Sequence, residues 1–225
     1  MARRNVVRQF TLRFESITLK TYGIVSQMVP VRFFAGTGLE ETFVAGFMLI
    51  DKLGLSARVG LSLVVRQTFY GFWFALVDQK LEPRPNYWLS LAFKRLVGRR
   101  VLAAYTDTSP PEMQPRVRVY AHCASKQSGY PTGSVVVYAM NICNETSRVF
   151  FNVSNSHSVD QFLFTAPQGN LTSTAIELNG ELVSMVSDTQ LPTFKAQRVV
   201  SDSGVEMPPY SIAFYVINAN AKACR

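Results

Sequence analysis

The chain has 225 residues, of which 48% are hydrophobic and 17% are charged, and its net charge is +8. This composition is sufficient for a buried core and excludes an intrinsically disordered chain, while the length predicts one or two domains. Three cysteines exclude a disulfide-dense miniprotein and leave at most one intramolecular bridge with one thiol left over. The two histidines, His122 and His157, do not have the spacing to cysteine that zinc sites use, so we expect neither a metal nor another cofactor.

The most basic part of the chain is its beginning, residues 1–36. It contains six Lys or Arg residues and one acidic residue, Glu15. Such an arm can bind nucleic acid, anionic lipid or a sulfated polysaccharide, and its composition is also that of a transit peptide. We favour a simpler interpretation, in which residues 1–36 are a basic arm without a fold of its own. The arm has no continuous apolar stretch of the kind that a secretory signal needs.

A first helix is predicted over residues 42–53, where apolar residues recur at helical spacing. Glu40 and Glu41 stand at its start, and carboxylates suit the positive end of a helix dipole. Gly54 follows at the position where glycine commonly ends a helix. We therefore expect a helix that begins beside two dipole-stabilising acids and ends before Gly54.

A strand and a second helix follow the first helix. Residues 61–65 are a continuous apolar, β-branched run, which is typical of a strand buried on both faces in a parallel sheet. Residues 86–97 are amphipathic at helical spacing, come after Pro85, and precede Gly98, a second glycine placed to end a helix. The order of helix, strand and helix is part of an α/β repeat.

Residues 59–77 have the length of a membrane span and carry a single charge. We disfavour a span because that charge, on Arg66, and the polar Gln67 stand at its middle, where they are costly in a bilayer. Gly71 also divides the stretch into a strand and a loop.

Short β-rich runs separated by turn signals make up the remainder of the chain. Asn179-Gly180 is a strong hairpin turn. The runs are residues 101–105, 117–123, 134–141, 148–152, 161–164, 175–178, 182–186 and 212–218. This pattern predicts an antiparallel β-sandwich.

Three N-glycosylation sequons lie in this β-rich part, at Asn144, Asn152 and Asn170. They indicate a secreted protein. Since residues 1–36 lack a secretory signal, a secreted body suggests that the chain is incomplete.

Several longer motifs resemble the heparanase family, which comprises retaining endo-β-glucuronidases of glycoside hydrolase family 79 that cleave heparan sulfate. The resemblance runs from Thr42 to the end of the chain. The motifs are residues 47–58, Val65-Arg66-Gln67, residues 85–98, residues 118–123, Leu178-Asn179-Gly180, Leu191-Pro192 and residues 221–224.

The resemblance implies an α+β architecture, in which the last βα units of a (β/α)₈ barrel precede a C-terminal antiparallel β-sandwich. Residues 1–36 would be the basic, unmatched arm, residues 37–98 the partial barrel, and residues 99–225 the sandwich domain. A whole barrel needs roughly 250 residues, so the chain can contain only part of one.

No catalytic residue is assigned to the chain. Retaining glycosidases need two carboxyl groups about 5–5.5 Å apart. The resemblance places the proton donor on an earlier strand, and the nucleophilic Glu before a Gly-rich loop of which residues 35–38 remain, with no acid in residues 28–34. Glu40 and Glu41 are the nearest carboxylates, and we interpret them as helix-dipole residues.

The resemblance implies two candidate substrate-binding regions. Gly71 matches the first glycine of a family segment, Gly-x-Gly-Asn-Tyr, whose Asn-Tyr the chain lacks, and the aromatic residues 72–74 either stack on sugars or pack internally. A basic cluster spans the junction of helix and sandwich, and its alternative interpretation is ordinary solvated charge. Its members are Lys94, Arg95, Arg99, Arg100, Arg116 and Arg118.

The resemblance also implies a disulfide between Cys123 and Cys224, which leaves Cys143 as the odd thiol. For the chain as a whole, the expected partners are heparan sulfate or another sulfated glycosaminoglycan and the missing barrel segment. Nucleic acid is not an expected partner. The parent protein would be secreted to the extracellular matrix or lysosomal.

Three functional hypotheses stay open. The chain is a C-terminal fragment of a heparanase-like hydrolase that is inactive by itself, a non-catalytic module that binds heparan sulfate, or a truncated product without independent function. As a barrel remnant it would expose residues 61–65 as an open strand, which is prone to aggregation.

Overall fold

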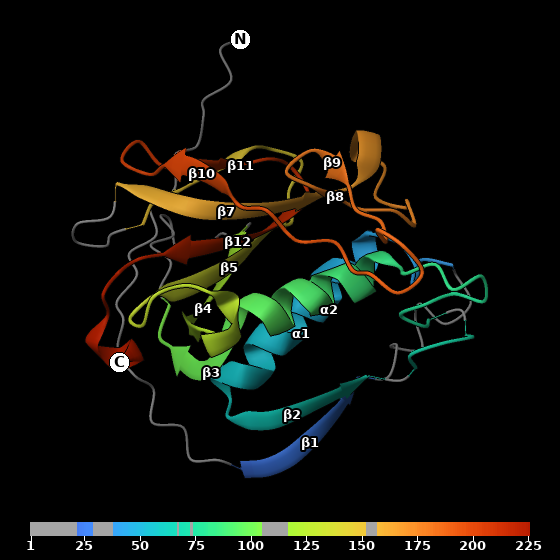
Figure 1. The fold of residues 1–225 in the computed structure, drawn as a ribbon, viewed down its shortest axis with the longest axis horizontal. Coiled ribbons are helices and arrows are strands. Elements are labelled where there is room, and N and C mark those ends of the chain that lie inside the picture. Colours follow the sequence, from blue (N-terminus) through green and yellow to red (C-terminus); the bar gives the residue numbers. More distant parts are fainter. Residues whose placement is uncertain (1–21, 29–37, 67, 73, 105–116, 152–156) are drawn as a thin grey trace. The chain divides into compact units, whose positions relative to one another are not determined.

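The computed structural model describes residues 22–28, 38–66, 68–72, 74–104, 117–151 and 157–225. The fold is α+β, with two α-helices and a large antiparallel sheet (Figure 1). The fold divides into two compact units. The sheet unit contains Arg95–Leu163 and Ala196–Arg225, and the helical unit contains Phe164–Lys195 together with the described residues before Arg95. The boundary falls within the second helix, near residue 98, while the three predicted domains stay a prediction.

The helical unit contains a strand, a helix and a second strand in chain order. Strand β1 (Tyr22–Met28) pairs in parallel with β2 (Leu61–Arg66), and helix α1 (Val44–Arg58) lies between them in the sequence and packs against β2 (Figure 1). Helix α2 (Pro85–Leu96) follows and belongs to this unit up to Lys94. The prediction that the whole arm lacks structure is therefore wrong for residues 22–28.

Helix α1 is longer than predicted and is capped differently. It continues through Gly54, which is buried within the helix, and ends at Arg58 before Gly60, whose φ is +84°. The penalty of a helical glycine, about 0.5–1 kcal/mol, is small enough for burial to outweigh it. Glu40 and Glu41 precede the helix rather than form its first turn.

Strand β2 confirms the predicted parallel pairing but contradicts the predicted burial. None of its side chains is buried, and Leu63 and Val65 are 52% and 41% exposed. This exposure shows that the apolar run is not covered on both faces, and β1 is the one strand that pairs with β2 among the described residues. The exposure expected of an open strand is therefore present.

The large sheet contains eight strands in the order β3-β4-β5-β12-β7-β8-β9, with β10 also paired to β7, and Figure 1 shows β5 and β12 side by side at its centre. The strands are β3 (Val97–Leu102), β4 (Val117–Ala124), β5 (Val135–Asn141), β7 (Ser158–Thr165), β8 (Glu177–Leu178), β9 (Glu181–Leu182), β10 (Gln197–Val200) and β12 (Ser211–Ile217). Strand β8, β9 and the last two residues of β7 belong to the helical unit. Asn179 and Gly180 join β8 to β9 with φ of 52° and 84°, as a tight hairpin turn requires.

A small second sheet covers one face of the large sheet within the sheet unit. It pairs β6 (Ser147–Val149) with β11 (Val205–Met207). Val149 and Met207 share one apolar core with alternate residues of β4, β5 and β12, such as Val119, Val137 and Tyr215. The β-branched and aromatic composition of these strands suits a pleated, buried surface.

Neither of the helices that the structure describes is long and apolar enough to cross a bilayer.

Candidate functional site

Arg99 and Arg100 of the predicted basic cluster lie in a bulge of β3, between Val97 and Val101. Val97 pairs with Ala124 and Val101 with His122, so four steps along β3 oppose two steps along β4. A Cβ atom on Gly98 would lie 2.6 Å from the main-chain oxygen of Cys123. Gly98 therefore has a different role from the predicted one, since α2 already ends at Leu96 and Gly98 permits close approach of two strands.

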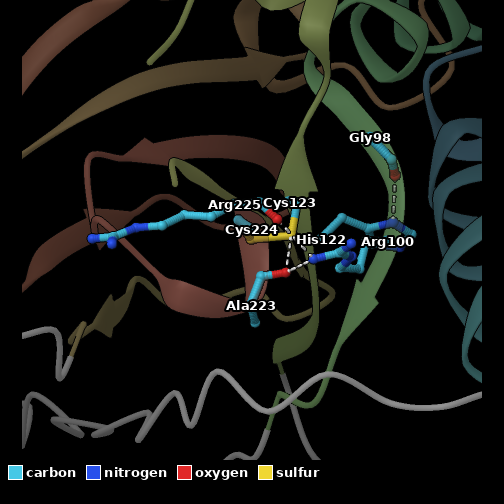
Figure 2. The surroundings of a disulfide bond; sticks show 7 residues. All are labelled: Gly98, Arg100, His122, Cys123, Ala223, Cys224 and Arg225. Atoms are coloured by element: carbon cyan, nitrogen blue, oxygen red, sulfur yellow. Dashed lines mark hydrogen bonds between the residues drawn. A yellow bond between two sulfur atoms is a disulfide. The ribbon is translucent and has the colours of Figure 1, made fainter. Parts of the chain in front are cut away.

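A buried histidine fixes this bulge. His122 Nδ1 lies 2.8 Å from the Gly98 carbonyl oxygen (Figure 2), and its Nε2 lies 3.2 Å from the Tyr138 hydroxyl. Burial lowers the pKa of His122 and raises the pKa of Tyr138, so both are neutral near pH 7. Since the carbonyl accepts, Nδ1 carries the hydrogen and Nε2 accepts from the hydroxyl. His122 and Tyr138 therefore hold the bulge in place, and their polar atoms are already engaged in internal hydrogen bonds.

The disulfide implied by the family resemblance is present next to the bulge. Cys123 and Cys224 are bonded across 101 residues of sequence (Figure 2). Arg100 donates to the main-chain oxygen of Ala223 and, at 3.4 Å, to that of Arg225. The Arg100 guanidinium therefore holds the C-terminal tail, and Cys143 is the free thiol.

The structure places Arg118 of the predicted basic cluster away from the bulge. Arg99 and Arg100 are exposed side by side on the bulge, and Lys94 is exposed on α2. Arg118 lies on β4 opposite Met140, five residues from Cys123, which is about 17 Å along a strand.

Of the remaining two members, only Arg95 can be placed. Arg95 is half-buried in the last turn of α2, and Arg116 lies outside the described residues. Arg99 and Arg100 therefore lie close together because they are neighbours in the sequence.

Gly71 lies in a folded segment after β2. Its φ is +85°, and its N–H faces the Val77 carbonyl oxygen at 3.4 Å. Arg66 donates to the Phe74 carbonyl oxygen at 3.0 Å, and burial lowers the pKa of Arg66 to about 10. Phe72 is 58% exposed with its ring 5.5 Å from that of Phe74, while residue 73 lies outside the described residues. An exposed ring of this kind can stack on a sugar face.

The sequence did not predict the surroundings of the two carboxylates before α1. Glu41 pairs with Arg84 at 3.3 Å, and Arg84 also pairs with Asp78 at 2.7 Å. Glu40 is only 5% exposed, and neither of its carboxylate oxygens has a hydrogen-bond partner among the described residues. Nothing in the local pattern signals this burial, because it arises from packing within the helical unit.

Two of the three predicted glycosylation sites can be placed. Asn144 is exposed between β5 and β6, and Asn170 is exposed in a turn before β8. Asn152 lies outside the described residues.

Comparison with known proteins identifies relatives of this chain. No protein-family profile matches it. The alignment with heparanase from Bos taurus is 232 positions long with 39% identity. It covers 94% of the chain and 41% of that protein. The chain is a partial homologue of the heparanases. Inactive heparanase-2 from Mus musculus is 33% identical over 198 residues, which cover 83% of the chain and 33% of that protein.

The comparison corrects one prediction and supports the fold of this heparanase homologue. Because 94% of the chain matches the bovine protein, the match includes part of residues 1–41, so the arm is not wholly unmatched. The chain spans about two fifths of the length of that relative. The GH51 α-L-arabinofuranosidase from Thermotoga petrophila has a TM-score of 0.55 at 10% identity, covering 78% of the chain and 38% of that structure. This likeness concerns the fold alone.

Proposed function

We propose that the chain is the C-terminal part of a heparanase-type glycoside hydrolase. Its helical unit would supply the last βα units of a (β/α)₈ barrel, and its sheet unit would be the C-terminal β-sandwich. Support for the first part is the parallel pair β1 and β2 with α1 between them in the sequence, followed by α2. Support for the second is the large antiparallel sheet whose core is shared with the small sheet of β6 and β11.

The reaction of the parent protein would be endo-hydrolysis of β-glucuronide linkages in heparan sulfate with retention of configuration. That chemistry needs one carboxyl group to protonate the leaving oxygen and a second to attack the anomeric carbon. In this chain Glu41 is engaged by Arg84 and Glu40 is buried, so neither is offered to a sugar. We therefore propose that the chain is inactive by itself. The proposal that the chain is part of a heparanase-type hydrolase rests on the 39% identity to bovine heparanase over 94% of the chain.

Binding of the anionic substrate would fall to exposed cations of the junction. Arg99 and Lys94 are exposed, whereas the Arg100 guanidinium is engaged by the tail. A guanidinium fork binds sulfate or carboxylate in a bidentate manner. We propose Arg99 as the strongest single contributor, with Lys94, Arg95, Arg100, Arg116, Arg118 and Gly71 as the remaining candidates.

The test is to measure cleavage and binding with the same preparation. The full chain is incubated with heparan sulfate, new reducing ends are counted, and binding is measured on a heparin column by the salt needed for elution. We expect no cleavage, with salt-sensitive binding that Arg99→Ala weakens. Arg148→Ala is the matched control, because Arg148 pairs with Glu206 at 2.5 Å elsewhere in the sheet unit. Cleavage by the chain alone would disprove the inactive fragment, and lack of binding at low salt would disprove the substrate class.

A second candidate function is a non-catalytic module that binds heparan sulfate. The similarity to inactive heparanase-2 favours it, because that relative is named inactive and covers 83% of the chain. The two functions differ when the upstream part of the protein is added. If the longest transcript encodes a Glu before the Gly-rich loop and its product cleaves heparan sulfate, the hydrolase is supported. Binding without cleavage by that longer product supports the module.

The third candidate, a truncated product without independent function, is favoured by the exposed apolar side chains of β2. Aggregation of the isolated chain without binding to heparin would support it. For the parent protein we propose secretion, to the extracellular matrix or lysosome.

A further inference from the structure

The turn that contains the third sequon is exposed and lies outside every helix and strand. Asn170 follows the short 3₁₀-helix η2 (Pro167–Gly169) and precedes β8, in an extended conformation with φ of −76° and ψ of 96°. Its side chain is exposed. A bulky polar group on this side chain would therefore extend into solvent.

Hydrogen bonds within the sequon orient the Asn170 carboxamide. Asn170 Oδ1 accepts from the Thr172 main-chain N–H at 3.1 Å and from the Thr172 hydroxyl at 2.8 Å. This is an Asx turn, in which the amide oxygen faces the backbone. Both bonds use the oxygen, so Nδ2 has no hydrogen-bond partner in the part of the chain that the structure describes. The nitrogen that a glycan would modify is free.

The turn is held in place without the Asn170 side chain. The carbonyl oxygens of Leu171 and Ser173 accept from the first N–H groups of α1, on Val44 at 3.0 Å and Phe43 at 2.8 Å. Ser173 N–H also donates to the Asn170 carbonyl oxygen at 2.9 Å. These main-chain bonds satisfy helix-terminal donors that would otherwise be unpaired. A substituent on Nδ2 leaves all of them intact.

We propose that Asn170 is an N-glycosylation site. The co-reactant is a lipid-linked oligosaccharide pyrophosphate. A bond forms between Asn170 Nδ2 and the anomeric carbon, the bond from that carbon to the pyrophosphate oxygen breaks, the lipid pyrophosphate leaves, and one Nδ2 proton goes to a base of the transferring enzyme. The site does not depend on hydrolase activity, only on entry into the secretory pathway, so its failure and that of the proposed hydrolase are separable.

The glycan would add a solvated group next to the start of α1. Glycans of this type are bulky and solubilising. Leu171, half-buried, follows Asn170 directly, and its carbonyl is one of the two that cap the helix. The glycan would thus shield the loop that closes the N-terminus of α1.

Four variants separate the effect of the glycan from the effect of the turn. Asn170→Asp keeps a side-chain oxygen to accept both Thr172 bonds but removes the nitrogen. Thr172→Ser keeps the hydroxyl and the sequon, whereas Thr172→Val removes both. Asn144→Gln removes the sequon between β5 and β6 and controls for a glycan there.

The experiment expresses the full chain behind a cleavable signal sequence in animal cells and maps peptides after treatment with a peptide-N-glycosidase. We expect Asn170 to be occupied in the wild type, in Thr172→Ser and in Asn144→Gln, and unoccupied in Asn170→Asp and Thr172→Val. Recovery of the unmodified Asn170 peptide from the secreted or membrane-enclosed wild-type chain overturns the proposal, whether Asn144 is occupied or no sequon is. Circular dichroism of Asn170→Asp checks that loss of the glycan does not follow from unfolding.

Discussion

The centre of the large sheet and the parallel pair of the helical unit are both built from apolar, β-branched runs, yet they differ in burial. Every side chain of β5 and β12 is buried, and each of these strands has a partner on both edges. In β2, Leu63 and Val65 are exposed, and β1 is its one strand partner in the described part of the chain. Similar local sequence therefore gives a closed core in one unit and an open strand in the other, because the small sheet of β6 and β11 packs on the central strands while Leu63 and Val65 of β2 remain uncovered.

The same contrast holds for buried polar groups. In the sheet unit, Asn141 Nδ2 lies within hydrogen-bond distance of three main-chain oxygens, including that of Glu145 at 2.8 Å, and its Oδ1 accepts from the Cys143 N–H. Among the buried side-chain atoms of the described residues, both carboxylate oxygens of Glu40 in the helical unit lack a hydrogen-bond partner, as does the Ser134 hydroxyl in the sheet unit. An unpaired carboxylate is costlier to bury than an unpaired hydroxyl. The buried amide of the sheet unit is therefore paired, whereas the buried carboxylate of the helical unit is not.

The largest effect is expected from removing the disulfide of the sheet unit. Replacing Cys123 and Cys224 together by Ser frees a loop of 101 residues. Chain entropy predicts a loss of about 4–5 kcal/mol in the free energy of unfolding. Urea denaturation followed by circular dichroism measures it, with Cys143→Ser as the control that should change little. Equal midpoints for the double variant and the control would show that the sheet does not depend on this bond.

The next largest effect tests the close approach of β3 and β4. Gly98→Ala places a Cβ 2.6 Å from the Cys123 oxygen, and we expect a loss of about 1–3 kcal/mol as the strands separate. Arg99→Ala, in the same bulge but exposed, should stay within about 0.5 kcal/mol of the wild type. Both values come from denaturant melts. Comparable values for the two variants would contradict the tight packing at Gly98.

A change of the opposite sign is expected in the helical unit. Glu40→Met replaces two unpaired buried acceptors with an apolar chain of similar length, so stability should rise by about 1–2 kcal/mol. Glu41→Gln, which weakens the pair with Arg84, should lower it slightly. Thermal unfolding of both variants gives the comparison, and a loss of stability in Glu40→Met would show that this carboxylate has a partner.

A smaller effect concerns pH. The pKa of His122 is lowered from 6.5 by burial, so the unfolded chain binds a proton more readily than the folded one. This contribution is fully present above about pH 6.5, and stability falls as the pH drops from there toward the folded pKa. His122→Asn keeps a donor for the Gly98 oxygen and removes the titration. Its unfolding free energy should depend less on pH between 7.5 and 5.5 than that of the wild type, and identical slopes would count against a buried neutral His122.

The smallest change in stability is expected on the open strand. Leu63→Thr and Val65→Thr alter exposed side chains, so unfolding midpoints should hardly move while light scattering at high protein concentration decreases. Val64→Thr, at a half-buried position of β2, is the control and should destabilise more. Unchanged scattering in the first two variants would show that β2 is not an aggregation surface.

Local pattern was sufficient for the elements whose residues repeat with the period of their structure. The alternation in residues 117–123 gave β4, and Asn179-Gly180 gave the hairpin of β8 and β9. Strand β10 was missed because Gln197–Val200 is largely exposed and begins with polar residues. Strand β11 was missed because three residues around Glu206 carry little pattern.

The site was less predictable than the fold, because its features depend on contacts between distant residues. Motifs identified the family and the Cys123–Cys224 pair. The predicted basic cluster is interrupted along the sequence by residues 110–115, and the β3 bulge and the register of β4 place Arg118 far from Arg99. The engagement of Arg100 by the tail depends on residues more than a hundred positions away, which no local pattern contains.

The position of β12 in the sheet has a consequence for how the protein is made. Ser211–Ile217 lies between β5 and β7 in space but is synthesised after all the other strands of this sheet that the structure describes. During translation β5 and β7 therefore emerge with an empty place between them and wait through about 50 residues of synthesis, some seconds at ribosomal speeds. The sheet can close only after β12 has left the ribosome, so nascent-chain binding factors would have access to the open edges of β5 and β7 throughout this delay.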